Sequence, residues 1–518
     1  MLRVFLVWFY VVVVGVYAWK DWYVGLCGLI LLVAVIQHPD MPKTVMGIQG
    51  LNPWNVLFIS VVLSWLRNRS QERLSWDMPP YVNVLLLSYL CAVAFATIRM
   101  LLAPGLLEDS MGSLLSEHVI NTLKWPVLGV ALFDGCRNRT RFTLGMVCFL
   151  AVYFLLALQV IRWMPLSSAL SGGELGERSL KILSNEVGYH RVNLSMMLAG
   201  AFWAMWAARP LWMSRLYSQL GVFAAAITFF GQALTAGRMG YATWVVVGFF
   251  LSLIRWRTYL LIAPLIVPVL AFTIVTVAPG VVDRFFEGFT KDTIDTARPT
   301  GPRGNTLPIP GEGPDMYTVT AGRTFAWTFV IDKIGESPLI GFGRESMTRT
   351  GLKAFLWNTY RESFPHPHNA YLEVLLDNGW FGILAILPFY LVVLHHSISL
   401  FRDSRSPVFV VSGGVACALV LALLVAAIGS QTFYPREGSV GMWCAIGLMF
   451  RVYVERARVL TNRAVVARVA EPESRVETPK GRRSRRRLQP GVLLRSHNAQ
   501  QKQPAGDSID ERLWQQAA

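Results

Sequence analysis

Charged residues are scarce in this sequence. Lys, Arg, Asp and Glu make up 15% of its 518 residues, whereas average globular proteins carry about 25%. Hydrophobic residues make up 53%, and 29 Phe, 18 Trp and 16 Tyr add the aromatic content typical of membrane-interface belts. This composition excludes a soluble enzyme, a disordered chain and a coiled coil.

Cysteine pairs and common catalytic motifs are also lacking. The six cysteines are scattered and form no Cys-x-x-Cys pair, so neither a zinc site nor a redox site is indicated. The sequence contains no Asp-x-Asp, no His pair of metal-binding spacing, no phosphate-binding loop and no Gly-x-Ser-x-Gly. These absences argue against a metal-dependent glycosyltransferase, a zinc protease, an ATPase and a serine hydrolase. We therefore expect neither a metal ion nor a cofactor.

Long apolar blocks are what the sequence does contain. A membrane-spanning helix needs about 20 mainly apolar residues, and because several blocks are short we predict about 12 or 13 spans. The blocks lie at 2–19, 22–37, 53–66, 80–98, 119–135, 142–163, 192–208, 215–234, 240–254, 258–277, 370–395, 407–428 and 438–454. The sequence therefore predicts an all-α polytopic membrane protein with one large extramembrane loop.

The positive charge predicts how the chain is oriented. The formal net charge is +16, and the chain from Arg451 onward carries 15 Lys/Arg against 7 Asp/Glu. Arginines also mark the short loops that fall on the same side as this basic tail, which the positive-inside rule assigns to the cytoplasm. We expect the five arginines between 482 and 487 to contact anionic membrane lipids, or to lie in a solvated tail, and we expect no nucleic-acid partner.

Four regions follow from this pattern. N-terminal transmembrane helices occupy 1–277, a large periplasmic loop 278–369, C-terminal transmembrane helices 370–455, and a basic, disordered cytoplasmic tail 456–518. The large loop carries 10 Lys/Arg and 10 Asp/Glu. Its proline- and glycine-rich part, 299–314, predicts a mobile flap, and 321–334 predicts an amphipathic helix.

Two arginines on the predicted outer side are candidate anion ligands. Arg238 lies between Gly237 and Gly240 at the start of an apolar block, where a guanidinium is costly unless it meets an anion. Arg323 opens the predicted loop helix, and a cation there opposes the helix dipole unless a phosphate binds. The alternative interpretation of each is an interfacial or solvent-exposed arginine.

A histidine pair enters the next apolar block. His366 and His368 alternate with Pro365 and Pro367, and the prolines stiffen the approach. His368 is expected at or just before a helix start at the outer membrane face. A surface or capping histidine is the plainer alternative.

The late-loop motif carries a family resemblance. Residues 368–382, HNAYLEVLLDNGWFG, resemble the signature of the bacterial O-antigen ligase and O-antigen polymerase superfamily. Arg323 with Trp327, the turn at 338–343, and Arg238 at the head of a span resemble its other elements. The family's common serine before that arginine is Gly237 here. The resemblance covers roughly 190–450, and the first half of the chain matches only in its pattern of spans.

The resemblance implies a membrane glycosyltransferase of the inner membrane with a GT-C-like helical bundle. Such enzymes transfer a glycan from undecaprenyl pyrophosphate to a hydroxyl of a lipid, glycan or protein acceptor, without a metal. Carried over, Arg238 and Arg323 would hold the pyrophosphate and His368 would act near the acceptor hydroxyl. Trp327, His366 and Asn369 would contribute to substrate binding.

Other functions fit the same features less well. An O-antigen or exopolysaccharide polymerase would use the same chemistry, and the sequence does not separate the two. A transporter or flippase for a lipid-linked glycan would need charged residues distributed within several spans. Here the spans contain almost no Asp, Glu or Lys, and the candidates cluster on one face.

Overall fold

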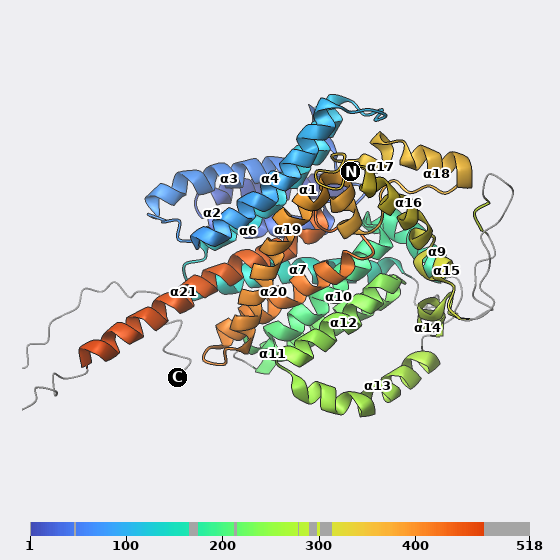
Figure 1. Ribbon diagram of the computed structural model, residues 1–518. Helices are drawn as coiled ribbons and strands as arrows, with labels where there is room; N and C mark the ends of the chain where they lie inside the picture. Colours follow the sequence, from blue (N-terminus) through green and yellow to red (C-terminus); the bar gives the residue numbers. More distant parts are fainter. Residues whose placement is uncertain are drawn as a thin grey trace, which may run out of the picture.

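The computed structural model describes residues 2–45, 48–164, 175–211, 215–277, 279–289, 298–300 and 313–470. This part of the chain is almost wholly helical and forms one elongated bundle (Figure 1). A single hairpin pairs the two-residue strands β1 (Thr44–Val45) and β2 (Ile48–Gln49). The predicted all-α class is confirmed. Most of the expected flap and the arginines at 482–487 lie outside the described residues.

Every predicted apolar block coincides with a helix. The N-terminal set comprises α1 (Leu2–Ala18), α2 (Trp22–Leu31) with η1 (Leu32–Val35), α3 (Pro53–Gln71), α4 (Pro80–Leu102), α6 (Asn121–Gly135), α7 (Arg139–Trp163), α10 (Arg191–Ala208), α11 (Arg215–Leu234), α12 (Arg238–Ile254) and α13 (Arg257–Val277). The C-terminal set comprises α19 (Ala370–Arg402), α20 (Pro407–Ala426) and α21 (Val440–Ala470). Helix α21 continues past 455, so residues 456–470 of the expected disordered tail are helical.

Four of these helices are long and apolar enough to cross a membrane: α4, α7, α19 and α20. Three shorter apolar helices are α1, α2 with η1, and α12. The chain is an integral membrane protein of the polytopic class. The total of 12 or 13 spans stays a prediction.

Short helices between the long ones gather at one end of the bundle (Figure 1). They are α5 (Met111–Leu115), η2 (Ser116–Ile120), α9 (Leu175–Ile182), η3 (Leu183–Val187), α14 (Pro279–Phe286), α15 (Met316–Thr320), α16 (Arg323–Glu336), α17 (Ser346–Arg349) and α18 (Leu352–Tyr360). Two 3-10 turns are η4 (Arg209–Leu211) and η6 (Glu437–Ser439). Helix α16 confirms the amphipathic helix predicted at 321–334. The C-terminal end of α21 projects from the opposite end of the bundle, away from these short helices (Figure 1).

Helices α10 and α20 form the centre of the bundle. Helix α20 is apolar all round and buried along nearly its whole length, which is the pattern of a helix enclosed by others. Small residues let α10 approach it closely: a Cβ on Gly200 would lie 2.6 Å from the Cβ of Ala422. This close crossing places the N-terminal end of α10 beside the loop that follows α20.

Helix α19 is broken at Gly379, whose φ of 62° and ψ of −157° are non-helical. The turn 337–343 docks into the break. The amides of Trp380 and Phe381 donate to the carbonyls of Pro338 (2.8 Å) and Leu339 (3.0 Å), which restores hydrogen bonds that the break removes. In the other direction, the amides of Phe342 and Gly343 donate into α19, to Leu376 (2.8 Å) and Asp377 (2.7 Å).

A buried ion cluster fastens the same junction. Arg344, just after the turn, contacts Glu373 (2.7 Å) and Asp377 (3.4 Å) of α19, and all three side chains are almost fully buried. Asp377 also accepts hydrogen bonds from Ser346 (2.5 Å) and Tyr434 (2.9 Å). Although burial disfavours the charged guanidinium, the two carboxylates raise the pKa of Arg344. Breaking such a buried cluster by removing one partner leaves an uncompensated charge.

Gly379→Ala should destabilise the protein strongly. The residue has positive φ, and an added Cβ would lie 2.3 Å from the carbonyl carbon of Leu339. Strain of this kind costs roughly 1–3 kcal/mol before the clash is counted. Thermal unfolding in detergent should therefore show a clear fall in Tm.

Gly335→Ala is the matched control, because nothing lies within 4 Å of a Cβ at this helical position. It should leave Tm unchanged or raise it slightly. Equal Tm values for the two variants would show that the break in α19 is not under constraint.

Candidate active site

Arg238 is the first residue of α12, directly after the turn that ends α11. Its guanidinium donates to the carbonyls of Glu287 (3.1 Å) and Thr318 (2.9 Å), and it lies 3.6 Å from the Glu287 carboxylate. It therefore ties the end of α12 to the segments around α14 and α15. The glycine before it has a local reason: a Cβ at Gly237 would lie 2.5 Å from the Cβ of Ser195. A serine at position 237 would require the backbone to shift.

Arg323 is the first residue of α16, as the sequence predicted. The preceding Gly322 has a φ of 75°, which brings the chain sharply into the helix. The side chain is half-buried, and one guanidinium nitrogen donates to the carbonyl of Gly429 (3.2 Å). Arg323 forms no ion pair with any described residue. Burial, with Arg238 and Arg191 nearby, lowers the pKa of Arg323 to about 10, so it remains charged at neutral pH.

His368 precedes α19 by two residues and has a φ of 52°, which is strained for a residue with a side chain. Its ring lies 3.9 Å from that of His366, centroid to centroid. The amide of His368 donates to Nδ1 of His366 (3.2 Å). The two histidines therefore form one unit, although sequence spacing alone presents them as separate positions.

Both imidazoles are held neutral. Burial, with Arg323 and His190 nearby, lowers the pKa of His368 to about 3. Burial, with His368 and several arginines nearby, lowers the pKa of His366 to about 2. At neutral pH each ring therefore has one nitrogen available to accept a proton or a hydrogen bond.

Trp327 and Asn369 position the histidines through the backbone. The indole N–H of Trp327 donates to the carbonyl of Pro367 (2.8 Å), which joins α16 to the histidine segment. The Asn369 side chain caps α19 by accepting from the amides of Tyr371 (3.0 Å) and Leu372 (3.2 Å). These atoms are engaged in holding the chain, so their contribution to substrate binding stays a prediction.

Three basic residues of this region escaped the sequence analysis: His190, Arg191 and Arg284. Burial, with Arg191 and Arg238 nearby, lowers the pKa of Arg284 to about 9. Burial of the His190 side chain, with Arg191 and Arg323 nearby, lowers the pKa of His190. Their positions on α10 and α14 are distant in sequence, and no motif marked them.

The result is a group of four arginines around one small volume. Arg238 disfavours the charges of Arg191, Arg284 and Arg323, and Arg191 disfavours those of Arg284 and Arg323. Glu287 contacts both Arg238 and Arg284, and Arg323 forms no ion pair with any described residue. Such a site is stabilised by a polyanionic ligand, which guanidinium groups can bind through paired hydrogen bonds. The described residues contain no group of three or more His, Cys, Asp or Glu side chains that could hold a metal ion.

One known protein family matches part of the chain. Residues 223–387 match the family described as O-antigen ligase. Because of this match, residues 223–387 are called the O-antigen ligase domain below. Members of this family are ligases and polymerases of the glycosyltransferase type. A search of curated proteins gave no match.

The O-antigen ligase domain contains most of the site but not all of it. Arg238, Arg284, Arg323 and the histidine pair lie within the matched residues. His190 and Arg191, on α10, and the loop after α20 lie outside them. The bundle therefore completes the electrostatic environment of the domain from segments on both sides of it.

Acid should destabilise the O-antigen ligase domain through the histidine pair. Both pKa values are lower in the folded protein than the usual 6.5, so the unfolded chain binds more protons as pH falls from 6.5 toward 3, and stability is lost in that window. At pH 5 the loss is roughly 2 kcal/mol per imidazole. Thermal unfolding of the wild type and of a His366→Asn, His368→Asn double variant at pH 7.5 and pH 5 measures it.

The double variant should lose less stability between the two pH values than the wild type. His395→Asn is the control, because His395 is exposed at the far end of α19, and it should behave like the wild type. Identical pH dependence in all three proteins would contradict the burial of neutral imidazoles.

Proposed function

We propose that this protein is a membrane glycosyltransferase of the O-antigen ligase type. It transfers a glycan from undecaprenyl pyrophosphate to an acceptor hydroxyl on the periplasmic side of the inner membrane, without a metal ion. The observation that carries this proposal is the convergence of four arginines beside a neutral histidine pair, within and around an O-antigen ligase domain.

The arginines act on the donor. As the bond between the anomeric carbon and the pyrophosphate oxygen breaks, negative charge accumulates on the leaving group. Arg323 and Arg238, supported by Arg191 and Arg284, stabilise that charge in a partly buried site where electrostatic interactions are stronger than in water. Their excess positive charge takes the place that a divalent ion occupies in metal-dependent transferases.

His368 acts on the acceptor. Its neutral imidazole accepts the proton of the acceptor hydroxyl while the hydroxyl oxygen bonds to the anomeric carbon. Undecaprenyl pyrophosphate leaves with the electron pair of the broken bond. With a pKa near 3, the His368 imidazole is a weak base before the donor binds. A bound pyrophosphate offsets the charge of Arg323 and so raises the basicity of His368. His366 and Trp327 fix its orientation.

Arg323→Ala should lower transfer by about 10²–10³-fold, the loss typical of removing one donor to a developing anion. Arg323→Lys should also be severely impaired, because an ammonium cannot make the planar two-point contact. Transfer of labelled glycan from lipid-linked donor in membranes, normalised to inserted protein, measures both.

Lys333→Ala is the matched control. Lys333 is a cation on the same helix, but it pairs with Glu336 (2.6 Å). It should transfer normally, and all proteins should transfer equally with and without EDTA. An Arg323→Ala variant with normal turnover, or activity that EDTA removes and magnesium restores, would contradict the arginine mechanism.

The sidedness proposal predicts opposite labelling of two exposed positions. Asp332→Cys, on α16, should react with an impermeant maleimide in spheroplasts. Ser404→Cys, between α19 and α20, should react only after the membrane is opened. Cys91→Ser removes the exposed native cysteine from both variants. The reverse pattern would place the arginine group in the cytoplasm and contradict the proposed reaction.

A further inference from the structure

A second space lies beside the arginine group. A cavity with about 710 Å³ not occupied by protein atoms, its open mouth included, is enclosed by α10, α20, the start of α21 and the loop 427–439. Neither Arg238, Arg323 nor His368 lines it.

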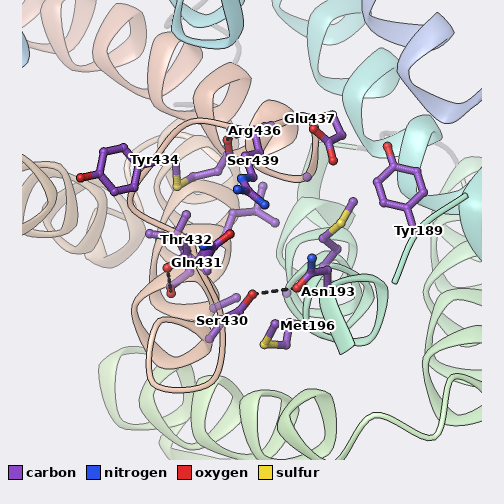
Figure 2. A pocket seen from close by; sticks show the side chains of 18 of the residues that line it. Tyr189, Asn193, Met196, Ser430, Gln431, Thr432, Tyr434, Arg436, Glu437 and Ser439 are labelled. Atoms are coloured by element: carbon purple, nitrogen blue, oxygen red, sulfur yellow. Dashed lines mark hydrogen bonds between the residues drawn. The ribbon is translucent and has the colours of Figure 1, made fainter. Parts of the chain in front are cut away.

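The two ends of this cavity differ in chemistry. The floor between α10 and α20 is apolar, with Met196, Met197 and Leu419. Other lining residues are polar: Figure 2 shows Gln431, Thr432 and Arg436 on one side of the space and Tyr189 across from them. Hydrogen-bond donors, acceptors and an aromatic ring thus surround one space.

The cavity adjoins the arginine group through two contacts. Ser430, in the cavity wall, follows Gly429, whose carbonyl accepts from Arg323 (3.2 Å). The Ser430 hydroxyl donates to the side-chain oxygen of Asn193 (2.7 Å), which lies two residues after Arg191 on α10. A molecule in the cavity would therefore sit next to whatever the arginines hold.

The cavity wall is held in place by the buried cluster of Arg344, Glu373 and Asp377, which also joins the turn 337–343 to α19. Gln431 donates to Glu373 (2.9 Å), and Tyr434 donates to Asp377 (2.9 Å). The guanidinium of Arg436 forms no hydrogen bond or ion pair with any described residue, so its donors face the cavity unused. A rigid wall with free donors is a feature of a binding site.

The charges of the cavity, unlike those of the arginine group, balance. Arg436 and Glu437 are the charged side chains that line this cavity. One cation and one anion therefore line the space, so its charges balance and do not favour a phosphate or a carboxylate.

We propose that this cavity binds an uncharged sugar ring of the acceptor, an inference that rests on the proposed function. Sugar hydroxyls both donate and accept hydrogen bonds, which matches Arg436 and Glu437 together with Gln431 and Thr432. The apolar face of a sugar ring packs on aromatic and aliphatic side chains, here Tyr189 and the methionines. The anionic donor goes to the arginines, and the neutral acceptor occupies the adjoining cavity.

A labelling experiment tests binding without any transfer. In full-length protein carrying Cys91→Ser and Thr432→Cys, we measure the rate of maleimide modification with glucose, galactose or N-acetylglucosamine as probes. Glucuronate, glucose 6-phosphate and farnesyl phosphate are the charged and lipid comparisons. A neutral sugar should slow labelling by about threefold when present at twice its dissociation constant. Arg436→Gln, added to the same protein, should abolish the protection.

A second experiment separates the acceptor from the donor. Met197→Trp should fill the cavity floor, so transfer should fall by at least tenfold, on the order of one lost binding contact, while labelled donor still binds the purified protein. Met111→Trp, at an exposed position on α5, is the control and should transfer normally.

Each other result overturns the proposal. Protection by charged sugars or farnesyl phosphate alone, or by no probe, would assign the cavity to another ligand or to none. Normal transfer by Met197→Trp, or loss of donor binding, would remove the cavity from the acceptor site. A wild type that transfers nothing would contradict the proposed function. The labelling result would still show whether the cavity binds a neutral sugar.

Discussion

The break in α19 and the turn that fills it set the geometry on which the site depends. The turn 337–343 ends α16, and α19 carries the histidine segment at its beginning. Four backbone hydrogen bonds and the buried Arg344 cluster hold these two parts together. At the other end of the same pair of helices, Trp327 donates to the carbonyl of Pro367. With both ends fixed, Arg323 and His368 have a defined separation without a direct contact between them.

Electrostatic repulsion within the site lowers the stability of the folded protein. Four arginines in a partly buried region disfavour one another's charge, and the backbone of His368 is strained. Local violations of this kind are typical of functional sites and persist where the surrounding structure is rigid. Here the rigid surroundings are the crossing of α10 and α20, and the turn 337–343 with the Arg344 cluster that holds it to α19. A bound polyanion would relieve this repulsion, which favours its binding.

Much of the fold could be predicted because its signals are local. Apolar blocks located the long helices, the pattern at 321–334 predicted α16, and Arg238, Arg323 and His368 were each placed correctly at or next to a helix start. The missed features depend on contacts distant in sequence. Nothing local shows that Arg191 approaches Arg323, or that Arg284 approaches Arg191 and Arg238. The extension of α21 to Ala470 was missed because its charged residues resemble a solvated tail.

The central claim is that the arginine group binds a pyrophosphate, and the most direct test is ligand affinity. Purified protein should bind undecaprenyl pyrophosphate about tenfold or more tightly than undecaprenyl monophosphate, since a second phosphate adds at least about 1.4 kcal/mol of contacts to the guanidiniums. In the Arg323→Gln, Arg284→Gln double variant, that preference should disappear while affinity for the monophosphate changes little. Equal affinity of the wild type for the two lipids, or an undiminished preference in the double variant, would contradict the account.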